Sequence, residues 1–286
     1  MPIAFSPEVK MIKFVILLVF GLFAVCGCST ISPKDGPAML QQNEAPDSHE
    51  IELIIVYDNN PFDPRLQESW GFSCLVRLPE KTVLFDTGGD SATLLHNMRA
   101  LEIAPAEIDA IVLSHIHGDH VGGLNGLLEE NSDVVVYLPQ SFPQGFGDGV
   151  RSLGAKVHEV SEAEELFARV YTTGELGSGI IEQSLVITTS KGLVIITGCA
   201  HPGVVHIIRT AKDIVPQERV YLTMGGFHLT GASTSQIESI IKEFRQLSVN
   251  KVAPCHCSGD ETRRMFREEY GEDYIDSGAG KIITWP

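Results

Sequence analysis

The stretch that decides the fold is Val112-Leu113-Ser114-His115-Ile116-His117-Gly118-Asp119-His120-Val121-Gly122-Gly123. Three histidines and one aspartate fall within six residues, directly after the apolar run 108–113, and a glycine pair closes the stretch. The apolar run predicts a buried strand, and α/β proteins usually place their sites where such strands end. Imidazole suits zinc and iron, and a carboxylate adds a harder ligand. The stretch therefore predicts a metal-binding loop rather than a polar loop with chance histidines.

The spacing inside this stretch divides its donors between two sides of a cavity. His115 and His117 are two residues apart, so in extended backbone their side chains point the same way. Asp119 and His120 follow on the turn and can reach the other side. Four donors are too many for one tetrahedral ion that must keep an open position for water, so the pattern predicts a second ion. Asp119 would both bind metal and orient the nucleophile.

Three later apolar runs also end in polar residues, and each run predicts a strand. Their ends are Gly198-Cys199-Ala200-His201, Gly225-Gly226-Phe227-His228 and Cys255-His256-Cys257. Strand ends at one edge would bring these segments to the HxHxDH stretch. We therefore predict a two-metal centre, because two ions need about this many ligands around a bridging water. The predicted ligands are His115, His117 and His201 for one ion, and Asp119, His120 and His256 for the other.

Two further residues have open alternatives. Asp86 ends another apolar run, and it could cap the turn before Gly88. We expect it instead to hydrogen-bond a ligand histidine, because metal-bound imidazoles commonly use their second nitrogen in this way. His228 is a candidate proton donor or substrate-phosphate contact, and the alternative is a surface histidine in a loop.

Length and charge restrict the class of partner. The chain has 286 residues and a formal net charge of −16, which argues against a nucleic-acid or anionic-membrane surface. We expect a small-molecule substrate and no nucleic-acid partner, and the sequence does not indicate an oligomeric state.

The N-terminal residues predict export. Lys13 followed by the apolar run 14–25 is typical of a signal peptide over residues 1–27, with Met11 as a candidate true start. The step Val25-Cys26-Gly27-Cys28 resembles a bacterial lipobox, which places a lipid on Cys28, and the alternative is an ordinary cleaved signal. Residues 28–49 are polar and predict a flexible tether before a domain over residues 50–286. The protein is then expected to be periplasmic or on the outer surface, held to a bacterial membrane only through its lipid.

The order of apolar patterns predicts the fold class. Strands come first, over 52–57, 71–78 and 82–85, and strands alternate with helices later, as in the amphipathic helix 233–247. The glycine-rich residues 141–160 suggest an irregular surface stretch. This order predicts an α/β protein with two sheets packed face to face and helices outside, a four-layer αββα sandwich.

The HxHxDH pattern followed by glycines resembles the metal-binding signature of the metallo-β-lactamase superfamily. The ordered segments GCAH (198–201), GGFHL (225–229) and PCHCSG (254–259) are similar to a branch that includes the dihydropterin-ribofuranosylaminobenzene-phosphate synthases. The resemblance runs from about Glu52 to Ile283 and implies a metallo-β-lactamase-like αββα sandwich with a divalent-metal site at one edge.

The resemblance also leaves two ligand assignments open. Cys199 stands where the superfamily holds a ligand cysteine or a bridging aspartate, and Glu182 stands where a ligand histidine often lies. Either Cys199 binds metal directly, or it is a buried thiol and His201 takes over. We favour His201, and we keep Cys199 and Glu182 as alternative ligands.

These observations predict an exported metal-dependent hydrolase. Two divalent ions, expected to be zinc with iron or manganese as alternatives, would hold a hydroxide that attacks an ester, lactone or phosphoester. The first alternative is a transferase of the dihydropterin synthase kind, although its substrates are cytoplasmic intermediates. The second alternative is a non-catalytic metal-binding or sensor protein.

Overall fold

The structure is a computed structural model that describes residues 51–216 and 219–285, so the predicted signal peptide and tether lie outside the described residues. The first sheet contains β1 (Ile51–Asp58), β2 (Phe72–Arg77), β3 (Thr82–Phe85), β4 (Ala110–Val112), β5 (Val135–Pro139), β6 (Lys156–Val160) and β13 (Ile282–Trp285). Its strand order is β13-β1-β2-β3-β4-β5-β6, and β3 to β6 run parallel.

The second sheet contains β7 (Glu164–Phe167), β8 (Val170–Thr172), β9 (Leu185–Thr189), β10 (Gly192–Thr197), β11 (Val220–Gly226) and β12 (Val249–Cys255). Its order is β12-β11-β10-β9-β8-β7, and β10, β11 and β12 run parallel. The carboxyl ends of these three strands therefore lie at the same edge of the sheet.

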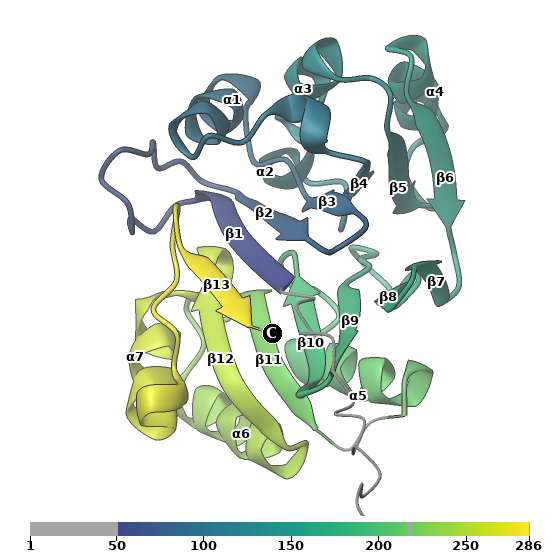
Figure 1. Ribbon diagram of the computed structural model, residues 1–286. Coiled ribbons are helices and arrows are strands. Elements are labelled where there is room, and N and C mark those ends of the chain that lie inside the picture. The colour runs from purple at the N-terminus through teal and green to yellow at the C-terminus, as the bar shows by residue number, and fades with distance from the viewer. Residues whose placement is uncertain (1–50, 217–218, 286) are drawn as a thin grey trace, which may run out of the picture. The chain divides into compact units, whose positions relative to one another are not determined.

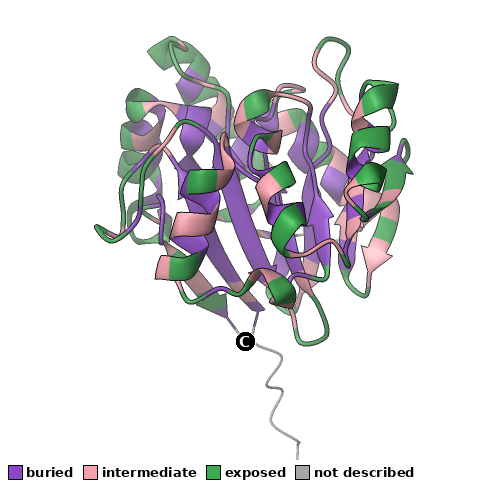
Figure 2. Ribbon diagram, turned by 90° about the horizontal axis from the view of Figure 1, so that it is seen from above, coloured by how far each residue is buried: buried purple, intermediate pink, exposed green. Residues whose placement is uncertain are grey.

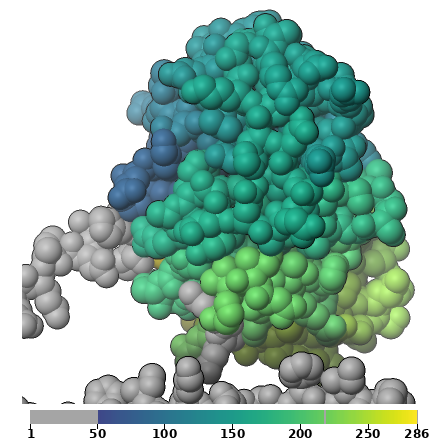
Figure 3. All heavy atoms as spheres, turned by 90° about the vertical axis from the view of Figure 1, so that its right-hand side faces the viewer, coloured from purple at the N-terminus to yellow at the C-terminus, as the bar shows by residue number. Residues whose placement is uncertain are grey.

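Helices cover the outer face of each sheet (Figure 1). The first sheet carries α1 (Ser91–Ala100), α2 (Gly118–Val121), α3 (Leu124–Glu130) and α4 (Gln144–Ser152), and the second carries α5 (Val204–Ile214), α6 (Thr234–Gln246) and α7 (Asp260–Tyr270). Short 3-10 turns are η1 (Pro105–Glu107), η2 (His256–Ser258) and η3 (Gly271–Asp273). In Figure 3 the teal segment around β6 and α4 lies above the light-green segment around α5.

The core has three apolar layers, as expected when two sheets each carry helices. Strand residues alternate between layers, because successive side chains point to opposite faces of a sheet. In β10, Val194 and Ile196 face the other sheet, whereas Leu193 and Ile195 pack under the second-sheet helices. Figure 2 shows the strands buried and the helices exposed on their outer sides. The predicted αββα sandwich is confirmed.

The prediction of an irregular stretch over residues 141–160 is wrong, because these residues form α4 and the edge strand β6. The glycines lower intrinsic helix propensity, but tertiary packing overrides it. Phe146 and Val150, one helical turn apart, both pack against the core cluster on the outer face of the first sheet. Within the described residues, no helix is long and apolar enough to cross a membrane.

Candidate metal centre

The predicted ligands meet at one edge of the sandwich, where strands of both sheets end. The first sheet contributes residues 115–120, which follow β4, and the second sheet contributes residues that follow β10, β11 and β12. The sheets approach closely there: a Cβ atom at Gly198 would overlap Oγ of Ser114. Glycine at 198 therefore allows segments from the two sheets to share one site.

The first donor group consists of His115, His117 and His201, whose ligand atoms all lie within 4.8 Å of one another. Nε2 of His115 lies 3.1 Å from Nδ1 of His117. The His201 ring centroid lies 4.8 Å from that of His115 and 4.9 Å from that of His117. Nε2 of His201 is buried and has no hydrogen-bond partner among the described residues. A buried polar atom without a partner is costly, and a metal ion would satisfy it.

The second donor group consists of Asp119, His120, Cys199 and His256. Nε2 of His120 lies 3.2 Å from Sγ of Cys199 and 3.3 Å from Nε2 of His256. Oδ2 of Asp119 lies 3.3 Å from the same His256 nitrogen. Cys199 is a free, buried cysteine. Cys199 thus belongs to the second donor group and His201 to the first, and a third group with His228 contains both, so the two residues can both act as ligands.

The outer nitrogens of three of these histidines are held by hydrogen bonds. Nδ1 of His120 lies 2.7 Å from Oδ2 of Asp86. Nδ1 of His115 lies 2.9 Å from Oγ of Ser114. Nδ1 of His256 lies 2.8 Å from Oδ1 of Asn59. Each contact fixes the ring so that Nε2 faces the other donors, which is how metal-ligand histidines are commonly oriented.

Ser114 and Asn59 were not found by sequence reasoning. Ser114 immediately precedes the first histidine, and Asn59 immediately follows β1 at the same sheet edge, so the strand-end criterion could have identified both. Next to Asn59, the buried Asp58 accepts the backbone N–H of His256 at 3.2 Å and that of Asn60 at 2.7 Å. The turn after β1 therefore positions both the backbone and the ring of His256.

Glu182 is buried and belongs to none of the donor groups. Its two oxygens accept three consecutive backbone N–H groups, those of Cys199 at 2.9 Å, Ala200 at 2.8 Å and His201 at 2.8 Å. Burial raises the pKa of Glu182 to about 7, although these hydrogen bonds oppose the shift. In this structure Glu182 anchors the loop that carries two donors.

The backbone around the site adopts an unusual conformation. Four residues other than glycine have positive φ there: Asp86 (60°), Ala200 (62°), His228 (52°) and His256 (48°). Such left-handed conformations cost energy for residues with a Cβ, and they cluster at functional sites. The fold therefore holds strained backbone at the ends of β3, β10, β11 and β12.

Crowding and burial keep part of the histidine cluster uncharged. Burial, followed by the neighbouring histidines, lowers the pKa of His115 far below its usual range and that of His201 to about 4. Burial also lowers the pKa of His120, but the charge and hydrogen bond of Asp86 outweigh it and raise the net pKa. A metal ligand must offer an unprotonated nitrogen, so the low values at His115 and His201 suit metal binding.

The carboxylate of Asp119 supplies a negative charge to the second donor group. Its burial raises the pKa, but the hydrogen bond to His256 and the charge of His120 outweigh this and hold the pKa well below its usual range. An ionised carboxylate next to imidazole nitrogens and a thiol forms a donor set that suits a divalent metal such as zinc. The residues present therefore fit the metal centre that the sequence predicts.

His228 lies at the solvent-exposed edge of the metal centre. Its side chain is exposed, and its ring centroid is 4.3 Å from that of His201. It forms a third possible donor group with Cys199 and His201. Next to the second donor group, the indole of Trp70 is 55% exposed and its centroid lies 5.0 Å from that of His256. Each of the two main donor groups thus has a solvent-accessible ring beside it.

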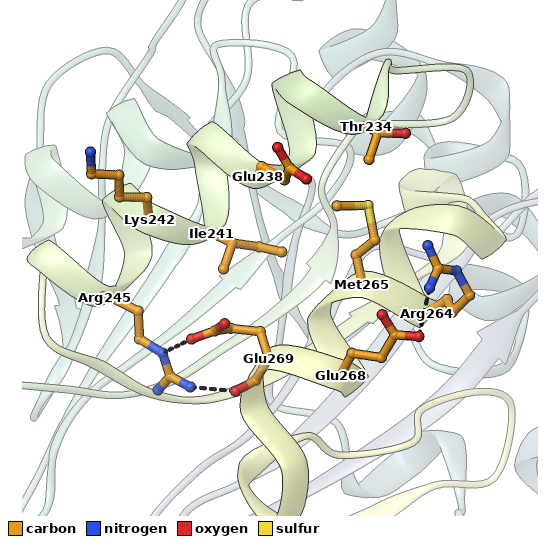
Figure 4. A pocket seen from close by; sticks show the side chains of 9 residues that line it. All are labelled: Thr234, Glu238, Ile241, Lys242, Arg245, Arg264, Met265, Glu268 and Glu269. Atoms are coloured by element: carbon orange, nitrogen blue, oxygen red, sulfur yellow. Dashed lines mark hydrogen bonds and ion pairs between the residues drawn. The ribbon is translucent and has the colours of Figure 1, made fainter.

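A groove with a volume of about 630 Å³ lies elsewhere, between α6 and α7 (Figure 4). No member of the donor groups lines it. Four of its charged side chains form ion pairs, Arg245 with Glu269 at 3.0 Å and Arg264 with Glu268 at 2.5 Å. The volume of this groove does not by itself identify it as the reactive site.

Comparison with known proteins agrees with this geometry. The family model of the metallo-beta-lactamase superfamily matches residues 71–256, and the chain belongs to this superfamily. The matched span contains all the residues of the two donor groups.

The chain is also similar to individual proteins over most of its length. The chain is 31% identical over 275 residues to the 7,8-dihydropterin-6-methyl-4-(beta-D-ribofuranosyl)-aminobenzene-5'-phosphate synthase of Methanocaldococcus jannaschii, covering 79% of this chain and 92% of the relative, which supports the predicted branch. A crystal structure titled as a metal-dependent hydrolase of the beta-lactamase superfamily shares 28% identity, with a TM-score of 0.68 over 82% of this chain and 98% of that one. The short form of human tRNase Z, at 14% identity and a TM-score of 0.57 over 81% of this chain and 98% of that one, shares the fold alone.

Proposed function

We propose that the protein is an exported metal-dependent hydrolase that cleaves an ester, lactone or phosphoester. The observation that carries the proposal is the pair of adjacent donor groups at a solvent-accessible edge. A structural metal site is closed by four ligands, whereas a hydrolytic site keeps positions for water and substrate. Export rests on residues 1–28 of the sequence, which lie outside the described residues.

Different residues of the chain would bind the ions, orient the water and protonate the leaving group. His115, His117 and His201 would hold one ion, and Asp119, His120, His256 and Cys199 the other. Two bound divalent ions, which we expect to be zinc, supply a water of lowered pKa and stabilise developing negative charge. The half-buried carboxylate of Asp119 would orient the nucleophilic water by accepting a hydrogen bond. The exposed imidazole of His228 donates a proton to the leaving group.

A transferase of the synthase kind is the second candidate. The synthase relative favours it, and so does the exposed indole of Trp70 beside His256, on which a flat heterocycle could stack. In that reaction the metal ions would bind a diphosphate leaving group.

The test is metal analysis of protein purified without chelator, combined with a panel of ester, lactone and phosphoester substrates. We expect close to two ions per chain and hydrolysis of at least one substrate class, with both lost in His115→Ala. His206→Ala is the matched control, because His206 is exposed on α5 outside the donor groups. Two bound ions with no turnover on any substrate would contradict the hydrolase and favour the transferase or a sensor.

A further inference from the structure

One cavity adjoins the donor groups on the side of the second sheet. Its volume is about 290 Å³, and it lies between the start of α5 and the segment that joins β11 to α6. His201 and His228 form part of its wall. A molecule in this cavity would therefore present one end to the donors.

The rest of the wall is mainly apolar. Val204 and Phe227 belong to the buried core under the second-sheet helices, and Val205, Leu229 and Ile240 are half-buried against the same core. The backbone leaves room as well, because a Cβ atom at Gly203 would meet no other atom within 4 Å. Half-buried apolar side chains next to a reactive site are typical of a pocket that takes an apolar part of a ligand.

The charges around the cavity also favour an apolar ligand group. Its lining includes no lysine or arginine, and its one carboxylate, Glu243, is paired with Arg209 at 2.5 Å. A phosphate or diphosphate would therefore find no positive charge here apart from that of a protonated His228. The transfer of an uncharged apolar group from water into the cavity would be favourable in free energy.

We propose that this cavity binds an alkyl or aryl group of the substrate, attached to the carbonyl or phosphoryl centre that is hydrolysed at the metal centre. The inference deepens the proposed hydrolase function and rests on it. A volume of 290 Å³ corresponds to roughly ten water molecules, enough for a short chain or one ring rather than a long lipid. Val205, Leu229 and Ile240 set the specificity for this group.

The experiment measures binding by calorimetry, so that it does not depend on turnover. The probes are n-alkylphosphonates from methyl to hexyl, added to the full chain purified with its metal. Affinity should rise roughly four-fold for each added methylene, the increment for burying one CH₂ group. In Ile240→Trp the larger side chain fills the cavity, and this increment should disappear for the longer probes.

Two further variants serve as controls. Ile240→Val should keep most of the increment, and Ile282→Trp should keep all of it, because Ile282 is exposed on β13 outside the cavity. Equal affinity for methyl and hexyl probes, or an increment that survives Ile240→Trp in folded protein, overturns the inference. Chain-length-dependent binding without ester or phosphoester turnover would instead overturn the hydrolase proposal and leave the apolar cavity in place.

Discussion

Asn59 and His256 follow strands of different sheets and hydrogen-bond to each other twice. Nδ1 of His256 donates to Oδ1 of Asn59 at 2.8 Å, and Nδ2 of Asn59 donates to the backbone carbonyl of His256 at 3.3 Å. Because Nδ1 carries the proton, Nε2 of His256 remains free to face Asp119, His120 and Cys199. One asparagine therefore selects both the orientation and the tautomer of a donor from the other sheet.

Replacement of Asn59 should weaken metal binding without unfolding the protein. Asn59→Ala removes the acceptor that fixes the ring, and outer contacts of this kind are worth about 10- to 100-fold in metal affinity. Asn59→Asp retains an acceptor and should recover most of the loss. Competition with a chromogenic chelator measures both variants, with Asn250→Ala, an exposed position on β12, as control. Unchanged affinity in Asn59→Ala would show that the packing around His256 orients it instead.

Cys199 and His201 should affect different ions. His201→Ala removes a donor from the histidine group, and Cys199→Ala removes one from the group that contains Asp119. We expect each variant to retain about one tightly bound ion per chain, as measured by elemental analysis after dialysis. If Cys199→Ala lost an ion and His201→Ala did not, His201 would not be a ligand. If neither changed metal content while His115→Ala did, the site would hold a single ion.

Glu182 should make the metal-free fold sensitive to pH. Its pKa is raised from an ordinary 4.5 to about 7 in the folded state, chiefly by burial, so the protonated form favours folding. The associated stability is fully present below about pH 4.5 and is lost as pH rises through 7. The loss is on the order of 3 kcal/mol at most. Urea unfolding of chelator-treated protein should show this decline.

The matched variants isolate Glu182 from other titrating groups. Glu182→Gln should be less stable at low pH, because one of its two accepting oxygens becomes an NH₂ group facing backbone N–H donors. Its stability should nevertheless fall less between pH 5 and 8 than that of the wild type. Glu68→Gln, at an exposed position, should follow the wild-type curve. A curve for Glu182→Gln parallel to that of the wild type would assign the pH dependence to other groups.

Cys28 should carry the membrane anchor. The proposal predicts that Cys28→Ser releases soluble protein from cells, because the sandwich would then have no lipid. Incorporation of labelled palmitate into the wild type, and its absence from Cys28→Ser, is the measurement. A wild type that never incorporates palmitate would leave simple secretion as the export route.

The sequence allowed prediction of those features that local pattern determines. Apolar runs located most strands, and the four donors of HxHxDH lie within six residues, so their proximity needs no tertiary information. His201 and His256 could be placed because each follows an apolar strand, and parallel strands end at a common edge. The structure brings both to the donors of the first sheet.

Other features depend on contacts that no local pattern encodes. Asn59 and His256 are 197 residues apart, and nothing near either residue specifies the partner. Glu182 could be considered as a ligand from its position, but only the fold shows that its oxygens are occupied by three N–H groups. The helix α4 was missed because its apolar contacts, rather than its glycine-rich sequence, stabilise it.

Both donor groups take members from both sheets: His115 and His117 face His201, and Asp119 and His120 face Cys199 and His256. An ion in either group would therefore cross-link the two sheets, in addition to their apolar packing and to hydrogen bonds such as that from Nε2 of Gln183 to the carbonyl of Leu113 at 2.9 Å. Loss of the ions would allow the two sheets to separate transiently at the edge that carries the donors. The opposite edge would stay closed. Hydrogen exchange would then accelerate together at the ends of β4, β10 and β12, although these strands are far apart in the chain.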